Sequence, residues 1–487
     1  TFLQTATSNR TETSQMTAEN LPWNAQKWHQ LNSVSALSGF GTNLVETTMT
    51  SYMGRVNYGF ADKYLLTASA RWDGASQLAE GNKWDFFPSA ALAWRLEQED
   101  FLAGVHWVNQ LKARVGVGTT GNSAIGAYQT LGAITQLYYT WGESVDGGYV
   151  SSDASLATPN PMANQDLGWE KTTQWNLGVD FSFLNSTING SLDVYTSRTS
   201  DLLMRMGIPA LTGYTTTFAN VGETSNKGID LNLNTYNFRG RDFSWTTDLV
   251  FSANRDKIEE LSMGKVDDIN NLWFIGERLA VGYDYLFDGI WQDTPEDLAE
   301  MAKFNANGHA FQPGSIRVKD LDGDYQIDPD NDRGIVGHSA PSWTAGLTNT
   351  FTYKNWDFSF FIYSRWNFMV ETGAERLQGR FAQRKVNYWT PDNPSTEYPR
   401  PNYNNFDGDV YRTSMNYQDG SFIKLRNVSL GYNLPANVAS RLGISNMKVF
   451  GQLMNPGLLY SKIDWIDPDL GGSTFNRGVV FGVNIGF

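Results

Sequence analysis

The sequence contains no cysteine, which excludes disulfide bonds, thiolate metal sites and cysteine nucleophiles. It contains only four histidines, and their spacing matches no known metal motif. No Ser-His-Asp arrangement can be nominated, and the glycines at 222 and 228 lack the Gly-Lys-Ser/Thr ending of a phosphate-binding loop. We therefore predict that the protein is not an enzyme.

Long hydrophobic runs are also missing. Aromatic residues make up 14% of the chain, yet no apolar stretch approaches the roughly 20 residues that a membrane-spanning helix needs. The net charge of −14, without a cluster of Lys and Arg among aromatics, argues against a nucleic-acid partner. If the chain crosses a membrane, only a closed β-barrel can satisfy its backbone hydrogen bonds there.

The last nine residues carry the clearest pattern in the chain. Apolar side chains alternate with small or polar ones, so one face of an extended strand suits lipid and the other does not. The apolar face comprises Val479, Phe481, Val483, Ile485 and Phe487. A free apolar edge strand invites aggregation, whereas a barrel pairs it. This segment is therefore predicted to be a C-terminal barrel-assembly strand that contacts outer-membrane lipid.

The same alternation recurs along most of the chain. Residues 1–48 are polar without a sustained period and are predicted to form an extracellular loop segment. Residues 49–487 supply about thirteen strands of membrane-crossing length, several joined by tiny turns such as 61–63 and 184–186. The predicted fold is all-β, a transmembrane antiparallel β-barrel.

The connections between these strands differ on the two sides of the predicted barrel. Every short turn falls on one side, and the long insertions, including 120–168, 255–341 and 369–420, fall on the other. Outer-membrane barrels have short periplasmic turns and long extracellular loops. Because bacterial single-chain barrels have an even number of strands, the odd count predicts that this chain does not close alone.

Several short segments carry a family resemblance. They include Arg55-Val56-Asn57-Tyr58, Asp62-Lys63-Tyr64-Leu65-Leu66, Arg71-Trp72-Asp73-Gly74-Ala75-Ser76, Trp389-Thr390-Pro391-Asp392-Asn393-Pro394 and Leu425-Arg426-Asn427-Val428-Ser429-Leu430-Gly431-Tyr432. Together they resemble the barrel of the SusC-like TonB-dependent transporters of the Gram-negative outer membrane, in that family's order.

The resemblance implies a 22-stranded barrel occluded by an N-terminal plug, lidded by a SusD-like lipoprotein and opened by TonB. This chain would be the C-terminal barrel portion, with Thr1 in an external loop and the plug and first strands in another portion. The implied function is active import of a bulky nutrient, with an oligosaccharide favoured. Peptide import by the same machinery, a passive porin or adhesin barrel, and a soluble glycan-binding or glycan-cleaving β-protein remain alternatives.

One loop has the composition of a metal site. Asp320, Asp322, Asp324 and Asp328 alternate with other residues, and Gln326 could add a backbone carbonyl, which together suit Ca²⁺ as a structural cofactor. Tyr325 stands where an EF-hand has glycine, and the last acid comes late, at Asp330 or Asp332. A solvated acidic loop is the alternative.

Aromatic residues in the predicted loops are candidates for binding the substrate or the lid. Flat rings beside polar groups suit oligosaccharides, although the same residues also suit packing between loops. The candidates are Tyr138, Tyr139, Trp141, Trp273, Phe274, Trp291, Tyr388 and Trp389.

Overall fold

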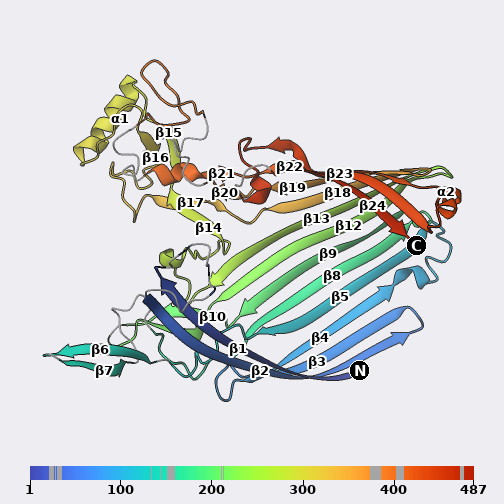
Figure 1. Ribbon diagram of the computed structural model, residues 1–487, viewed down its shortest axis with the longest axis horizontal. Helices are drawn as coiled ribbons and strands as arrows, with labels where there is room; N and C mark the ends of the chain where they lie inside the picture. Colours follow the sequence, from blue (N-terminus) through green and yellow to red (C-terminus); the bar gives the residue numbers. More distant parts are fainter. Residues whose placement is uncertain are drawn as a thin grey trace.

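The computed structural model describes residues 1–487 except 21–22, 24–26, 28, 30–35, 133, 143, 151–159, 210, 212, 373–384, 402–410 and 472–475. Within this range the dominant feature is one curved antiparallel sheet of 14 strands, with β1 at one edge and β24 at the other (Figure 1). Each strand pairs with the next strand of the sheet along the chain, as in an up-and-down barrel wall.

The strands of this sheet are β1 (Phe2–Glu19), β2 (Ala36–Phe60), β3 (Tyr64–Ala75), β4 (Trp84–Arg95), β5 (Val108–Asn122), β8 (Glu170–Phe183), β9 (Ile188–Ser200), β12 (Glu223–Arg239), β13 (Phe243–Glu260), β18 (Trp343–Tyr353), β19 (Trp356–Trp366), β22 (Phe422–Asn433), β23 (Asn446–Ser461) and β24 (Gly478–Gly486).

The long connections carry five two-stranded sheets and helix α1 (Pro295–Ala306), whereas helix α2 (Ala436–Arg441) lies between β22 and β23. The paired strands are β6 (Thr135–Trp141) with β7 (Ser144–Val150), β10 (Leu203–Gly207) with β11 (Thr216–Asn220), β14 (Val281–Tyr285) with β17 (Arg333–His338), β15 (Phe287–Ile290) with β16 (Ile316–Val318), and β20 (Met369–Glu371) with β21 (Tyr417–Asp419). Among the described residues, neither helix is long and apolar enough to pass through a bilayer.

The prediction of an all-β, antiparallel barrel wall is confirmed, and so are the short turns that join its strands. Ala61 and Asp62 adopt φ values of 55° and 54°, and Lys354 adopts 53°. Residues with a left-handed backbone conformation allow a tight turn to follow the twist of the two strands that it joins. The short connections gather at one end of the sheet and the long ones at the other, as Figure 1 shows.

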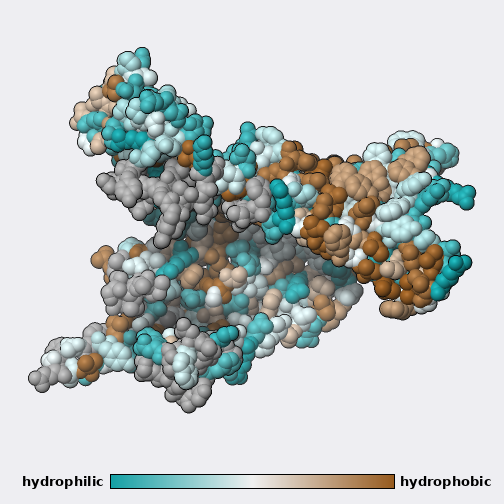
Figure 2. All heavy atoms as spheres, turned by 45° about the horizontal axis from the view of Figure 1, so that its top comes forward, coloured by the Kyte–Doolittle hydropathy of each residue, from teal (hydrophilic) through white to brown (hydrophobic). Residues whose placement is uncertain are grey.

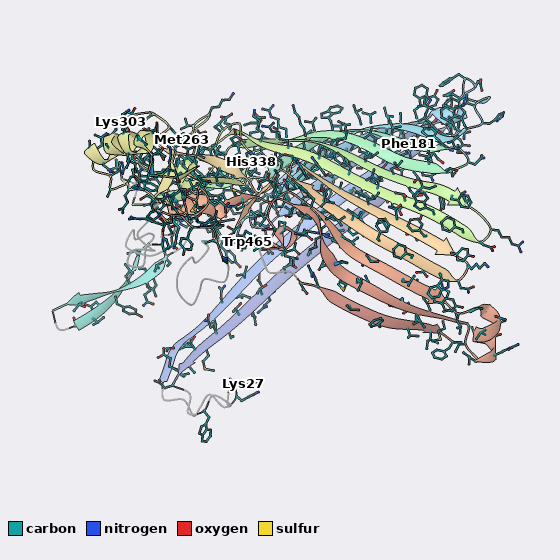
Figure 3. The ribbon with its side chains drawn as sticks, turned by 90° about the horizontal axis from the view of Figure 1, so that it is seen from above. Lys27, Phe181, Met263, Lys303, His338 and Trp465 are labelled. Atoms are coloured by element: carbon teal, nitrogen blue, oxygen red, sulfur yellow. The ribbon has the colours of Figure 1, made fainter. Side chains whose placement is uncertain are left out.

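The prediction that residues 1–48 form a loop is wrong in its secondary structure. These residues supply β1 and most of β2, which pair from Phe2 with Gly54 to Glu19 with Ala36 and bring the sheet to 14 strands instead of about thirteen. Thr1 likewise does not begin in a loop, because its amino group donates a hydrogen bond of 2.8 Å to the carbonyl oxygen of Arg55. Figure 3 shows this hairpin reaching away from the sheet toward Lys27.

The alternation missed β1 because its side chains are almost all exposed, and polar residues occupy both of its faces. A strand has a period of two in hydrophobicity only where one face meets lipid or a core.

The two faces of the sheet differ in chemistry. One carries exposed apolar side chains such as Leu177, Val194 and Ile229, and the other lines hollows with polar residues such as Asn427 and Gln452. In Figure 2 hydrophobic residues gather over the strands at the right, and the loops at the upper left are largely hydrophilic. A transmembrane barrel has this pattern, with apolar residues toward lipid and polar residues toward its interior.

Candidate binding surface and metal loop

Ion pairs cross the polar face of the sheet. Arg114 on β5 donates to Asp180 on β8 at 2.7 Å and to Asp193 on β9 at 3.1 Å, and Lys112 lies 2.7 Å from Asp180. Farther along, Ser252 on β13 donates to Asp230 on β12 at 2.6 Å. Such a wall offers charged and hydrogen-bonding groups to a polar solute or to a protein segment inside the barrel.

The connection from β13 to β18 folds, together with part of the connection from β19 to β22, into a small module with one core. We call residues 281–338, together with 385–401 and 411–416, the loop module. Its core consists of Ile290, Trp291, Met301, Phe304, Ile316, Val318, Ile327, Trp389 and Tyr411. A loop with buried apolar side chains of its own holds a defined shape. In Figure 3, Lys303 of this module lies at the end of the sheet opposite Phe181.

Helix α1 is held in the loop module by its cap and by one arginine. Thr294 caps the helix by accepting from the backbone N–H of Asp297 at 3.3 Å. Arg317 stacks 4.4 Å over the ring of Trp291 and also lies within 3.5 Å of Asp297 and 3.2 Å of Glu300. Sequence reasoning missed Arg317, because only the pairing of β15 with β16 brings it beside the helix.

The acidic loop brings three of its predicted ligands together. Ligand oxygens of Asp320, Asp322 and Asp324 all lie within 4.8 Å of one another, and they could hold a metal ion. Tyr325 adopts φ = 61°, the left-handed turn that glycine makes in an EF-hand, so the substitution does not prevent the turn. Its ring contacts Phe304 edge-on at 5.5 Å between centroids, and this packing supports the strained backbone.

Asp328 and Asp332 do not join the three converging acids of this loop. Asp328 is not among the converging acids, since its carboxylate accepts from the backbone N–H groups of Asp330 and Asn331 at 2.8 and 2.9 Å. Asp332 is buried and accepts from the backbone N–H of Leu321 at 2.8 Å, which closes the loop across its base. The side-chain amide of Gln326 donates a hydrogen bond to the carboxylate of Asp324 at 3.1 Å.

The electrostatics of the loop favour a cation. Desolvation and the neighbouring carboxylates of Asp324, Asp332 and Asp320 raise the pKa of Asp322, although a backbone hydrogen bond partly offsets them. A bound cation would relieve this repulsion. His309, a residue that the sequence left without a role, accepts from the backbone N–H of Ile327 at 3.0 Å and so ties the loop to the end of α1.

The candidate aromatic residues fall into three groups. Phe274, Trp291 and Trp389 are buried, so their packing alternative is favoured; Trp389 donates to the side-chain oxygen of Gln292 at 3.2 Å. Trp273 is half-buried, whereas Tyr138 and Tyr388 are exposed. The side chains of Tyr139 and Trp141 lie outside the described set. Of the described candidates, only these two tyrosines are exposed.

A buried ion cluster joins the last long connection to β22. Lys424 lies 2.5 Å from Asp467 and 3.3 Å from Asp469, and Arg426 donates from Nε to Asp469 at 2.9 Å. Burial opposes the ionisation of Asp469, yet Arg426 and Lys424 hold its pKa below the ordinary value. The ionised carboxylate therefore adds stability at neutral pH that is lost as pH falls through the lowered pKa.

Comparison with known proteins agrees with this architecture. The family model described as TonB dependent receptor-like, beta-barrel, matches residues 4–447. The chain belongs to the TonB-dependent receptor family. It is 33% identical over 451 residues to TonB-dependent receptor P3 of Formosa agariphila, covering 88% of this chain and 42% of that protein. It is 30% identical over 438 residues to TonB-dependent receptor SusC of Bacteroides thetaiotaomicron, covering 87% of this chain and 41% of that protein.

Solved structures show the same fold for this TonB-dependent receptor. The RagAB peptide importer in its open-open state aligns with a TM-score of 0.75 at 23% identity, covering 93% of this chain and 48% of that chain. A second structure, of the RagAB peptide transporter, aligns with a TM-score of 0.76 at 20% identity, covering 99% and 56%. The SusC-like resemblance and the prediction of a partial barrel are thereby confirmed.

Membership of this family also indicates the cellular location of the receptor. It is an outer-membrane protein of a family of non-enzymatic transporters, as the sequence predicted. The chain spans less than half the length of the curated relatives it matches, between 41% and 45%.

Proposed function

We propose that this chain forms part of the barrel wall of a TonB-dependent importer that carries a bulky polar nutrient across the outer membrane. The observation that carries the proposal is the polar, ion-paired interior face of a 14-stranded wall in a TonB-dependent receptor. An N-terminal plug and barrel portion would complete the wall, TonB would act through that portion, and a SusD-like lipoprotein would cover the loops.

Two nutrient classes fit this proposal. Oligosaccharides suit exposed aromatic rings such as Tyr138 and Tyr388, although three other candidate rings are buried. Peptides are favoured by the likeness of the fold to the RagAB peptide importer, and their charged groups would suit a wall that carries Arg114, Asp193 and Asp230. The two classes differ in the uptake that each predicts.

Uptake in cells that carry the complete receptor tests the proposal. A labelled mixture of oligosaccharides and one of peptides of matched size should show TonB-dependent uptake of one class, competed by the unlabelled members of that class. Deletion of TonB should abolish this uptake, since the plug would stay closed. Uptake that survives the deletion would instead support a passive porin, and binding without any uptake would support an adhesin.

The lid is tested on the purified receptor. Extraction from outer membranes in a mild detergent should bring down a lipid-modified surface protein at an equimolar ratio, as intact mass spectrometry would measure. Recovery of the receptor without such a protein would contradict this part of the proposal.

We further propose that the acidic loop binds Ca²⁺ through Asp320, Asp322 and Asp324, with the backbone carbonyl of Gln326 as a further ligand. The ion would brace the loop against the core of the loop module, into which Ile327 is inserted. At a Ca²⁺ concentration of 100 times Kd, binding adds about 2.7 kcal/mol to the stability of the module.

Calorimetry on the complete receptor should therefore detect Ca²⁺ binding that the double variant Asp320→Ala/Asp322→Ala loses. The control Asp330→Ala should bind normally, because that carboxylate is not among the converging acids. Removal of the ion with EDTA should speed cleavage of the loop by protease in the parent only. Equal Ca²⁺ uptake by parent and double variant would refute the site.

A further inference from the structure

A hollow of about 760 Å³ opens on the outward face of the sheet where β8, β9, β12 and β13 approach their long connections. Its lining includes the outward residues Trp175, Leu177, Val194, Ile229, Lys227 and Arg255. The register explains the order of these side chains. Leu177, Val194 and Ile229 form one row across the strands, and Trp175, Thr196, Lys227 and Arg255 form the next row toward the long connections.

Lys227 and Arg255 are direct cross-strand partners on one face, and side by side their like charges repel. In the part of the chain that the structure describes, neither head group has a carboxylate or hydrogen-bond partner. Three neighbouring cations do have partners: Arg198 lies 2.5 Å from Glu223, Lys257 lies 2.8 Å from Glu259, and Arg278, which also lines the hollow, donates to the backbone carbonyl of Ala340 at 2.8 Å. An anion from outside the chain would relieve the repulsion between these two adjacent cations.

The level of this pair in the membrane follows from the strands. Trp175 lies eight residues along β8 from Phe183, whose ring contacts Trp107 and Phe181 in an aromatic belt at the short-turn end. A transmembrane strand needs about 9–11 residues to cross the hydrocarbon layer. Lys227 and Arg255, in the row of Trp175, therefore lie where the apolar layer ends on the side of the long connections.

A second aromatic belt marks the same boundary farther around the sheet. The rings of Phe251 and Trp343 lie 5.9 Å apart, those of Trp343 and Trp366 lie 5.7 Å apart, and Trp366 stacks on Tyr460 at 5.6 Å. Aromatic belts occupy the headgroup level of outer-membrane barrels. Anionic groups at this level of the outer leaflet are the phosphates of its lipids.

We propose that this hollow binds a phosphorylated lipid of the outer leaflet, with its phosphate between Lys227 and Arg255 and its acyl chains along Leu177, Val194 and Ile229. Arginine and lysine both bind phosphate through charge-assisted hydrogen bonds, and the apolar row below them accepts hydrocarbon. This inference depends on the outer-membrane location of the family and not on the nutrient or on TonB.

Native mass spectrometry of the complete receptor in detergent tests the site, with phosphorylated lipid A as the probe. The variant Lys227→Gln/Arg255→Gln should weaken retention of the lipid about tenfold or more, since each charge-assisted contact contributes that order of affinity. The matched control Arg198→Gln/Lys257→Gln removes two charges from the same face and should change retention less than about twofold.

Two further arms identify the source of the anion. Lipid A without its phosphates should bind at least about tenfold more weakly to the parent, and millimolar inorganic phosphate should not displace the lipid. Equal retention by the double variant, or equal binding of the dephosphorylated lipid, would overturn the proposal, and displacement by inorganic phosphate would assign the cations to a free anion. Migration of unheated samples as folded barrels verifies that each variant is folded.

Discussion

Replacing Trp291 with alanine should unfold the loop module while the 14-stranded sheet remains intact. Trp291 is 2% exposed, its ring meets Phe304 at 5.9 Å between centroids, and the guanidinium of Arg317 lies 4.4 Å over the ring. Truncation of a buried tryptophan costs about 3–5 kcal/mol through lost burial and the cavity left behind. A module with so small a core cannot absorb this loss.

Limited proteolysis of the complete receptor, with the cuts mapped by mass spectrometry, measures this effect. Trp291→Ala should open cleavage sites within 281–338, whereas Leu298→Ala should not, because Leu298 lies in α1 of the same module but is 44% exposed. The unheated variant should still migrate as a folded barrel. Resistance to protease equal to that of the parent would mean that the module gains its stability from elsewhere.

Loss of the charge at Lys424 should release the connection between β23 and β24 from the wall. Lys424 and Asp467 are each 1% exposed, so the Lys424→Met variant leaves Asp467 buried without its cation and Asp469 with Arg426 alone. Removing one partner of a buried ion pair costs about 3–5 kcal/mol, because the remaining charge stays desolvated.

Hydrogen exchange of the complete receptor checks this expectation. Amides of residues 462–471 should exchange about a hundredfold faster or more in Lys424→Met, with little change in β5 and β8. The double variant Lys424→Met/Asp467→Asn should recover most of the protection, because asparagine carries no charge yet can still cap the 3₁₀ turn Pro468–Leu470 as Asp467 does. Equal exchange in all three proteins would show that the cluster does not hold the connection.

Strands and turns followed from sequence wherever one face met lipid. The predicted turns at 61–63 and 184–186 join β2 to β3 and β8 to β9, and the terminal strand predicted from Val479 to Phe487 coincides with β24 to within one residue at each end. Alternation and turn residues are local signals that tertiary contacts do not override there. β1 lacked that signal, and only its pairing with β2 revealed it.

Of the candidate sites, the acidic loop could be predicted from sequence, and the surroundings of the aromatic residues could not. Asp320, Asp322 and Asp324 converge as predicted, because alternate residues of one tight loop stay close whatever surrounds them. The surroundings of Trp291 and Trp389 could not be read from sequence, since they meet in the core of the loop module from positions nearly a hundred residues apart. Exposed and buried aromatic residues have the same local sequence signature.

The amino-acid sequence by itself determined the barrel class, the segregation of short and long connections, and the convergence of three acidic side chains in one loop. These three properties depend on the alternation and spacing of residues within short segments, and the backbone geometry of such a segment follows directly from that local pattern. Only the tertiary structure decided which loop aromatics are exposed, which acid closes the acidic loop, and that Lys227 and Arg255 stand together on the outward face with no partner among the described residues. Those properties depend on the register between strands and on packing between distant segments, and no local pattern encodes either.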